Sequence, residues 1–189
     1  MKGVIEFAHE LLKEILLEGD LAVDGTLGNG HDTLFLAKAV SPSGKVYGFD
    51  IQETAIKRTR ERLDATGKSD DSVTLIHASH HRLSDYVPPH GIKAAIFNLG
   101  YLPRGNKKIV TKHETTIAAL TALQPRMEIR GRIAVVVYPG HPEGKDEADV
   151  LIPYFKNIDQ TKWDVTKYEM LNQVNDPPFL IVMEKRQGS

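Results

Sequence analysis

The sequence predicts an α/β fold: a doubly wound, Rossmann-like sheet that is mostly parallel, with helices on both faces and an antiparallel C-terminal strand. Short apolar runs alternate with stretches of helical periodicity from residue 21 to residue 155, which is typical of a parallel sheet covered on both faces. Near the C-terminus two strand-like runs are separated only by a loop, and strands joined without a helix pair antiparallel.

The first predicted element is a helix over residues 4–16, because apolar side chains recur there at spacings of three and four before Gly19. Pro125 lies in a helical stretch that otherwise continues to Ile129, so the end of that helix stays open. The other expected helices are 33–40, 54–63, 113–123 and 147–155. Buried strands are expected at 21–23, 46–49, 73–76, 94–97, 133–138 and 180–183. The closing antiparallel pair is expected at 165–170 and 179–184.

Composition limits the class of protein. The 189 residues are 41% hydrophobic and 26% charged, without repeat or linker, which predicts one domain over 1–189 with an N-terminal helix (1–18) packed on it. The absence of Cys excludes thiol catalysis, disulfides and thiolate metal sites. The longest apolar run, 133–138, is far too short to span a membrane, so we expect a cytoplasmic protein. A formal charge of −1 offers no global positive field, so any RNA contact must be local.

Ligands of doubly wound sheets bind beyond the carboxyl ends of the strands. The first strand ends in Asp24, and the turn after it, Gly25-Thr26-Leu27-Gly28-Asn29-Gly30, opens a helix. Such glycines let a ligand approach the backbone, and the helix start offers N–H groups. A dinucleotide site would need a third glycine where Thr33 stands. We therefore expect Asp24 to meet a ligand ammonium, directly or through water, and the backbone of 28–30 to meet a carboxylate. The alternative is a structural turn in which Asp32 or Thr33 caps the helix.

The second strand ends in Asp50, 20 residues after Gly30. At this spacing a carboxylate accepts the two ribose hydroxyls of an adenosine. Ile51 would line the adenine slot and Gln52 would touch ribose or base. The alternative is that Asp50 caps the next helix.

The third strand end carries three histidines, His77, His80 and His81. Their spacing and the lack of a neighbouring carboxylate argue against a metal, so we predict no metal site. Ser79 or His80 would instead contact the adenine, or the histidines lie on a surface loop.

The fourth strand ends in Asn98-Leu99-Gly100-Tyr101, which resembles the N-P-P-Y motif of amino-group methyltransferases with Leu-Gly in place of the prolines. The side-chain carbonyl of Asn98 and the main-chain carbonyl of Leu99 can accept the N–H groups of a nitrogen nucleophile. Tyr101 can stack on a planar base. In the alternative interpretation Asn98 is a cap and Tyr101 packs on the sheet edge.

Two further features concern the acceptor. His141 follows the next strand and either takes the proton of an amine, which is mostly protonated at neutral pH, or is a turn residue. A basic segment after the fourth strand suits backbone phosphates or is a solvated face; it consists of Arg104, Lys107, Lys108 and Lys112. A second basic stretch is diluted by acids and is interpreted as helix surface: Lys57, Arg58, Arg60 and Arg62.

Taken together, D-G-T-L-G-N-G-H-D-T, F-D-I-Q, H-A-S-H, F-N-L-G-Y-L-P and V-Y-P-G-H resemble the class I S-adenosylmethionine-dependent methyltransferases first described as putative rRNA methylases, from Asp24 to Met183. That family includes MnmM-type tRNA wobble-uridine methyltransferases. The resemblance implies methyl transfer to the amine of 5-aminomethyl(-2-thio)uridine, release of S-adenosylhomocysteine, the tRNA anticodon stem-loop as partner and a homodimer. The implied cofactor residues are Thr26, Asn29, Asp32, Asp50, Gln52, Ser79 and His80, and the implied acceptor residues are Asn98 and Tyr101.

Other functions stay open. An rRNA or small-molecule N-methyltransferase would have the same cofactor half and differ only in the acceptor. A nicotinamide oxidoreductase is disfavoured by Thr33. A non-catalytic module that binds S-adenosylmethionine or RNA would keep the glycine turn but would not need Asn98.

Overall fold

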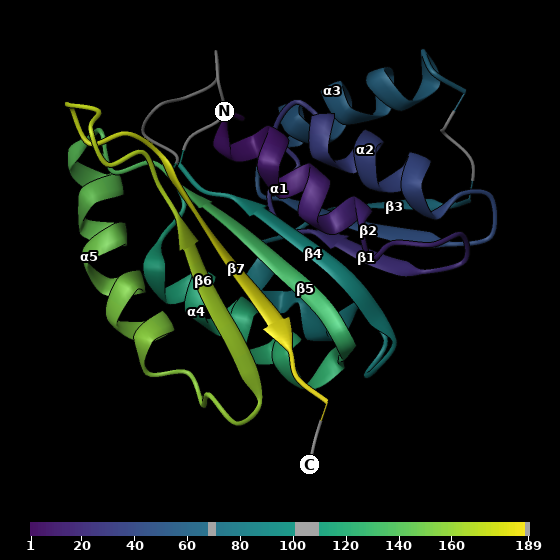
Figure 1. The fold of residues 1–189 in the computed structure, drawn as a ribbon. Helices are drawn as coiled ribbons and strands as arrows, with labels where there is room; N and C mark the ends of the chain where they lie inside the picture. The colour runs from purple at the N-terminus through teal and green to yellow at the C-terminus, as the bar shows by residue number, and fades with distance from the viewer. Residues whose placement is uncertain (68–70, 101–109, 188–189) are drawn as a thin grey trace.

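The computed structural model of the chain describes residues 1–67, 71–100 and 110–187. Its centre is a seven-stranded sheet of order β3-β2-β1-β4-β5-β7-β6 (Figure 1). The first five strands are parallel, and β7 is antiparallel to both β5 and β6. The predicted fold class, with its antiparallel C-terminal strand, is confirmed. The strands are β1 Leu21–Asp24, β2 Lys45–Asp50, β3 Val73–His77, β4 Ile92–Asn98, β5 Met127–Val137, β6 Trp163–Tyr168 and β7 Phe179–Lys185.

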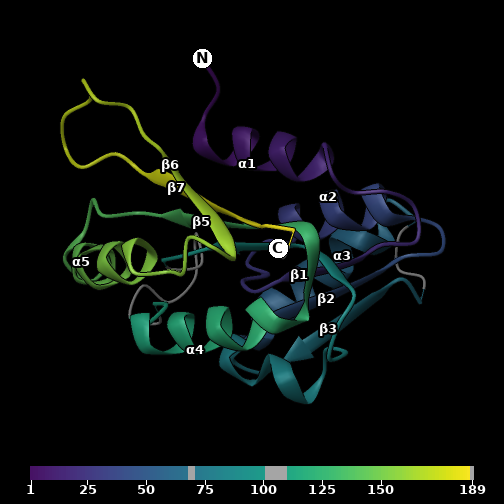
Figure 2. The ribbon, with the colours of Figure 1, turned by 60° about the horizontal axis from the view of Figure 1, so that its bottom comes forward.

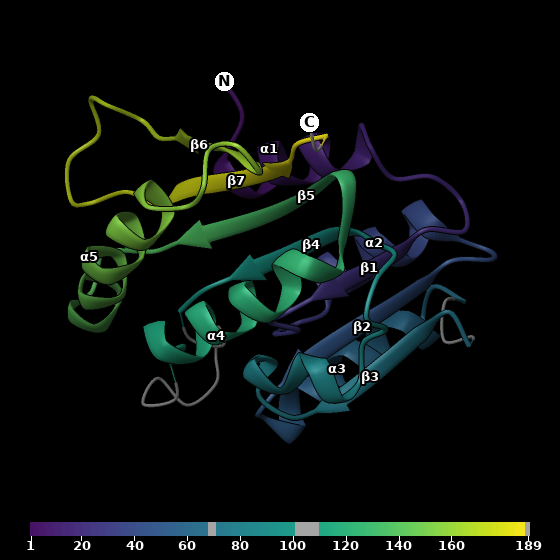
Figure 3. The same cartoon turned by 90° about the horizontal axis from the view of Figure 1, so that it is seen from below.

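Helices cover both faces of this sheet (Figure 2). Because side chains alternate along a strand, neighbouring residues of β4 enter different cores: Ile96 packs with α1 and α2, whereas Phe97 packs with α4 and α5. Figure 3 shows α4 and α5 along one face, with β7 and β6 beyond β5. The helices are α1 Val4–Lys13, α2 His31–Val40, α3 Glu53–Asp64, α4 His113–Leu123 and α5 Pro142–Lys156, with 3-10 turns η1 His80–Asp85 and η2 Gln124–Arg126.

Three boundaries differ from the sequence-based expectation by three residues or more. Helix α1 ends at Lys13 instead of residue 16. Helix α5 begins at Pro142 instead of residue 147, because proline fits the first helical position and His141 accepts a backbone N–H as the cap. Pro125 lies in η2, and β5 begins directly afterwards, so Ile129 belongs to a strand. Within the described residues no helix has the length and apolar character needed to cross a membrane.

The register brings the predicted site together. Asp24 of β1 lies opposite Gly48 of β2 and Ile96 of β4, and Asp50 lies opposite His77 of β3. The carboxyl ends of these four strands therefore share one edge of the sheet, where ligands of such folds bind.

Candidate functional site

Asp24 is a buried residue that stabilises the glycine turn by hydrogen bonds. The side chain is fully buried; Oδ1 accepts the N–H of Thr26 at 3.0 Å, and Oδ2 accepts the hydroxyl of Thr33 at 2.5 Å. Direct contact between Asp24 and a ligand ammonium is therefore excluded by burial, and contact through water stays a prediction. The capping alternative is also wrong, because the N-cap of α2 is Gly30 and no side chain caps it.

Two glycines of the turn are required by space and conformation. A Cβ at Gly25 would collide with the ring of Phe97. Gly30 has φ +76°, in the left-handed region, and a Cβ there would lie 2.9 Å from the backbone of Thr59. The backbone of the turn therefore packs directly on β4 and α3.

Asn29 is held by two arginines of α3. Arg58 Nη1 donates to Asn29 Oδ1 at 3.2 Å, and Arg62 Nε donates to the Asn29 carbonyl at 2.7 Å. The interpretation of these two arginines as plain helix surface is therefore wrong. Their spacing of four residues puts both on one helix face, a signal that the acidic residues of the same stretch, Glu53, Glu61 and Asp64, obscured.

Asp50 joins the ends of β1 and β2. Its Oδ2 accepts the N–H of Gly28 at 3.1 Å and its Oδ1 accepts the N–H of Gln52 at 2.9 Å, while burial raises the pKa of the carboxyl. Each carboxylate oxygen has a second acceptor position, which suits a pair of hydroxyls. No side chain caps α3, whose N-cap is Gln52, so the capping alternative fails here too. Ile51 is about half exposed beside it.

His80 is a buried neutral imidazole. Its Nδ1 lies 2.9 Å from the Gly25 carbonyl, its ring meets Phe97 edge-on, and burial lowers its pKa to about 4. The neutral ring donates from Nδ1, which leaves Nε2 as a buried acceptor without a partner in the described residues.

The neighbours of His80 have other partners. Ser79 Oγ bonds His81 Nδ1 at 2.8 Å, and His77 Nε2 lies 3.0 Å from the Ile51 carbonyl. The surface alternative fits His77 and His81, which are exposed, but not His80. Across 1–67, 71–100 and 110–187, no group of three His, Asp or Glu residues could hold a metal ion.

Asn98 is anchored through its backbone and its side chain. Its N–H donates to Thr26 Oγ1 at 2.7 Å, its Nδ2 lies 3.4 Å from Asp32 Oδ2, and its side chain shares a hydrogen bond with Tyr138. Burial, and secondarily the charge of Asp32, raise the pKa of Tyr138 to about 12, so the phenol stays protonated. The carbonyl and amide of Asn98 are thus fixed beside the glycine turn, and Leu99 is buried next to them.

Sequence reasoning missed two members of this site. Tyr138 ends the apolar run 133–138, which hid its polar hydroxyl among core positions. His9 lies on α1, and its Nε2 is 2.7 Å from Asp32 Oδ1. The interleaving of His9 with apolar residues was the available signal, but nothing local points to Asp32, 23 residues away.

The role of His141 as proton acceptor is not supported. Its Nδ1 accepts the N–H of Gly144 at 3.0 Å and caps α5. The lone pair of this nitrogen is thus used by the helix cap, and the same Nδ1 lies 3.4 Å from Glu143 Oε2. The cap fits the turn-residue alternative, and the role of His141 as a base stays a prediction. Four other predicted residues, Tyr101, Arg104, Lys107 and Lys108, lie outside the described residues, and Lys112 is exposed just before α4.

The strongest electrostatic feature is a group of three carboxylates around the turn: Asp24, Asp32 and Asp50. Burial, and then the charge of Asp32, raise the pKa of Asp24 to about 7, and Asp50 contributes in the same direction. In the part of the chain that the structure describes, no Lys or Arg forms an ion pair with them, and His9, beside Asp32, is the one basic side chain within ion-pairing distance. A cationic ligand would relieve this accumulation of negative charge.

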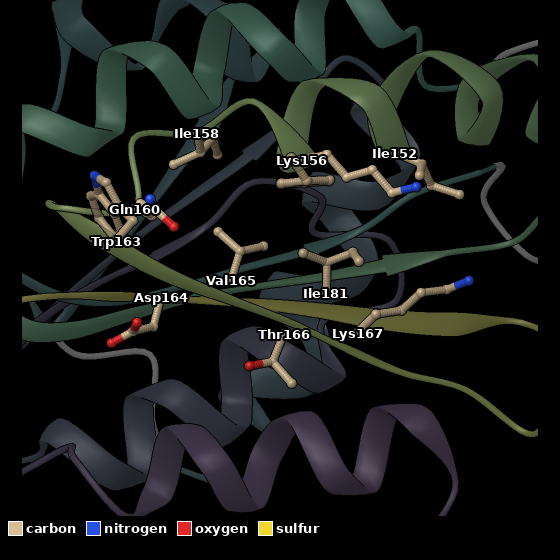
Figure 4. Close-up of a pocket in the computed structure, with 11 residues that line it drawn as sticks. Ile152, Lys156, Ile158, Gln160, Trp163, Asp164, Val165, Thr166, Lys167 and Ile181 are labelled. Carbon is tan, nitrogen blue, oxygen red and sulfur yellow. The ribbon is translucent and has the colours of Figure 1, made fainter.

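A groove elsewhere shares no residue with this site. It lies between α5 and the β6–β7 pair, and Val165 and Ile181 point from the sheet toward Ile152 and Lys156 of the helix (Figure 4). Its lining is mainly apolar and adjoins the edge strand of the sheet, away from the ends of β1, β2 and β4.

The strand order, the glycine turn between β1 and α2 and the acids at the ends of β1 and β2 define a class I S-adenosylmethionine-dependent methyltransferase. A family model described as "Putative rRNA methylase" matches residues 46–184, and the chain belongs to that family. It is 38% identical to the Arabidopsis thaliana protein named "tRNA (mnm(5)s(2)U34)-methyltransferase, chloroplastic", over 99% of this chain and 71% of the relative.

Solved structures agree with this assignment. A putative rRNA methylase from Clostridium thermocellum superposes with a TM-score of 0.95 at 40% identity, covering 98% of both chains. A putative methyltransferase from Streptococcus mutans, solved in complex with SAH, has a TM-score of 0.89 at 40% identity and covers 98% of this chain and 99% of its own.

Proposed function

We propose that the protein transfers the methyl group of S-adenosylmethionine to the primary amine of 5-aminomethyl(-2-thio)uridine at the wobble position of tRNA, forming the methylaminomethyl nucleoside. The observation that carries this is the placement of Asn98, whose fixed amide lies beside the carboxylate-lined glycine turn. The name of the Arabidopsis relative supports the same substrate.

The residues at the strand ends fit this cofactor. S-adenosylmethionine supplies an electrophilic methyl group on a sulfonium and also carries an ammonium, so it brings two positive charges. The three carboxylates of Asp24, Asp32 and Asp50, which pair with no Lys or Arg in the described chain, suit such a ligand. Asp50 would accept the ribose hydroxyls, and the buried Nε2 of His80 would accept an adenine amino hydrogen. The N–H groups of Gly28 and Gly30 already donate to Asp50 and to the Leu27 carbonyl, so within this turn the N–H of Asn29 would donate to the carboxylate. Thr26, Gln52 and Ser79 would lie around it.

The acceptor half works by positioning. With Nδ2 of Asn98 turned to Asp32, the Asn98 carbonyl faces away from that carboxylate and can accept an N–H of the amine, as can the Leu99 carbonyl. Alignment of this kind can supply about 7 to 11 kcal/mol of the barrier. The amine must be neutral to react, and exclusion of water from the site disfavours its charged ammonium form.

The decisive experiment offers labelled S-adenosylmethionine to tRNA and, separately, rRNA from a host that lacks this gene, followed by nucleoside analysis. We expect label in methylaminomethyluridine of tRNA. Label found only in rRNA would show that rRNA, and not tRNA, is the substrate. If neither RNA is labelled but S-adenosylhomocysteine still raises the melting temperature of the protein, only the cofactor-binding part of the proposal would remain. Asn98→Ala should abolish turnover and retain S-adenosylhomocysteine affinity; full turnover would refute the role of Asn98.

RNA binding is proposed for the basic segment after β4. Neutralising Lys107 and Lys108 together should raise the half-saturating tRNA concentration and flatten its dependence on salt. The reason is that a protein with fewer phosphate contacts releases fewer counterions when it binds the tRNA. Replacing Lys57 and Lys145, which are exposed on α3 and α5, is the matched control. If the salt dependence of tRNA binding is unchanged in the double variant, these two lysines do not contact the RNA.

The quaternary state and compartment are also proposals. The family resemblance implies a homodimer, which sedimentation of the free protein tests: a monomer at micromolar concentration would contradict it. The proposed compartment is the cytoplasm, and fractionation of the source cells checks this location.

A further inference from the structure

His9 reaches the reaction centre from the N-terminal helix. Its Nε2 is 2.7 Å from Oδ1 of Asp32, and its ring stacks on Phe35 with centroids 4.0 Å apart and planes 4° apart. Asp32 and Phe35 both belong to α2, so this helix holds the imidazole by a hydrogen bond at Nε2 and by stacking on the face of the ring. The His9 side chain is 25% exposed and that of Asp32 only 7%, so this contact is largely shielded from water.

The second oxygen of Asp32 contacts the side-chain amide of Asn98. Asn98 Nδ2 lies 3.4 Å from Asp32 Oδ2, near the upper limit of a hydrogen bond. A small rotation of the carboxylate would therefore lose this contact and allow the planar amide to turn. The amide orientation decides whether a carbonyl or an NH₂ group faces the amine of the substrate. Of the two side chains that bond this amide, Asp32 and Tyr138, Asp32 is the one that His9 contacts.

We infer that His9 is a positioning residue for methyl transfer: it fixes the rotation of the Asp32 carboxylate, and Asp32 in turn keeps the Asn98 carbonyl directed at the amine. The inference rests on the proposed function and extends it by assigning α1 a part in the reaction. At 2.7 Å a proton lies between Nε2 and Oδ1, and the imidazole donates it whether the ring is neutral or protonated. A glutamine at position 9 can donate the same bond without titrating.

The kinetic test compares His9→Ala and His9→Gln with Lys13→Ala, a change of an exposed residue on the same helix. Single-turnover methylation is measured with saturating S-adenosylmethionine and tRNA, and S-adenosylhomocysteine affinity is measured by calorimetry. We expect His9→Ala to lower the maximal rate about 10- to 100-fold, as small misplacements do. Its ligand affinity and half-saturating tRNA should stay within about threefold of wild type. His9→Gln should recover most of the rate, and Lys13→Ala should match wild type.

A second readout needs neither cofactor nor RNA. The side-chain NH₂ signals of Asn98, assigned by their loss in Asn98→Ala, report its contact with Asp32 in nitrogen-edited NMR spectra. We expect His9→Ala to shift these signals and His9→Gln and Lys13→Ala to leave them near the wild-type positions.

Three results would overturn the inference: a full maximal rate in His9→Ala, equal impairment in both His9 variants, or unmoved Asn98 signals in His9→Ala. Equal impairment would indicate that position 9 must exchange a proton. If wild-type protein methylates no aminomethyluridine, the proposed function fails, whereas the amide signals still decide whether His9 positions Asn98.

Discussion

Asp50 is the residue that we expect to contribute most to cofactor affinity. Its two oxygens already accept the N–H groups of Gly28 and Gln52, and a ribose diol would add two hydrogen bonds to a charged acceptor. Hydrogen bonds to charged groups contribute about 1.5 to 3 kcal/mol each. Asp50→Asn should therefore weaken S-adenosylhomocysteine binding at least about tenfold in calorimetry. Asp149→Asn, an exposed change on α5, is the control, and equal affinity of the two variants would show that Asp50 does not hold the ribose.

His80 makes stability depend on pH with a definite sign. Burial lowers its pKa from 6.5 to about 4 in the folded protein, so between these values the unfolded chain binds more protons. This contribution is fully present above pH 6.5 and is lost as the pH falls toward 4, by about 3 kcal/mol in total. His80→Asn keeps a donor toward the Gly25 carbonyl but does not titrate.

Urea unfolding of wild type and His80→Asn at pH 7.5, 5.5 and 4 checks this expectation. Buried carboxyls with a raised pKa, such as Glu147, act in the opposite direction, so the informative quantity is the difference between the two proteins at each pH. The advantage of wild type over the variant should shrink as the pH falls. A difference that is constant with pH would mean that His80 does not titrate with a lowered pKa.

Residue types and spacing predicted part of the site. Asp50, the glycine turn and Asn98 each follow a strand, and the rule that ligands bind at strand ends was enough to place them together. The base role of His141 gains no support because its Nδ1 caps a helix that begins five residues earlier than expected; the sequence His-Pro is itself a helix-start signal. Tyr138 and His9 were missed because their partners are set by long-range packing.

At the level of elements, a buried carboxylate connects α5 to the start of α4. Glu147 Oε2 accepts the hydroxyl of Thr111 at 2.7 Å, and Oε1 accepts that of Thr116 at 3.2 Å. Thr111 Oγ1 also accepts the N–H of Gly100, two residues after Asn98. Glu147 therefore fixes the chain on both sides of residues 101–109 without entering the site itself.

Glu147→Ala should destabilise the protein by about 2 to 3 kcal/mol, because it leaves buried hydroxyls without an acceptor and creates a cavity. Glu147→Gln keeps a carbonyl acceptor and removes a carboxyl whose pKa burial raises, so its free energy of unfolding should stay within about 1 kcal/mol of wild type. Denaturant unfolding at pH 7.5 measures both. Equal losses in the two variants would show that the negative charge, and not the hydrogen bonds, stabilises this connection.

At the level of the whole molecule, sequence periodicity predicts where the strands lie in the chain but not how they are ordered in the sheet. Alternating apolar runs and helices predicted every strand to within a few residues, except that β5 extends back to Met127. They could not give the order β3-β2-β1-β4-β5-β7-β6, because which strands pair is decided by contacts far apart in the chain. The packing of α1 on α2, β5 and β7 is likewise long-range, so its part in the site appeared only in three dimensions.

A single domain over 1–189 predicts one cooperative transition, and the chain contains a suitable probe. Trp163, the sole tryptophan, is buried in β6 against the groove beside α5, at the opposite edge of the sheet from β3. If the antiparallel end and the cofactor half unfold together, Trp163 fluorescence and far-ultraviolet circular dichroism should give the same midpoint. S-adenosylhomocysteine should raise both by the same amount, because a ligand stabilises the whole unit to which its site belongs. If S-adenosylhomocysteine left the midpoint of the Trp163 fluorescence transition unchanged, we would conclude that the chain unfolds as two separate units.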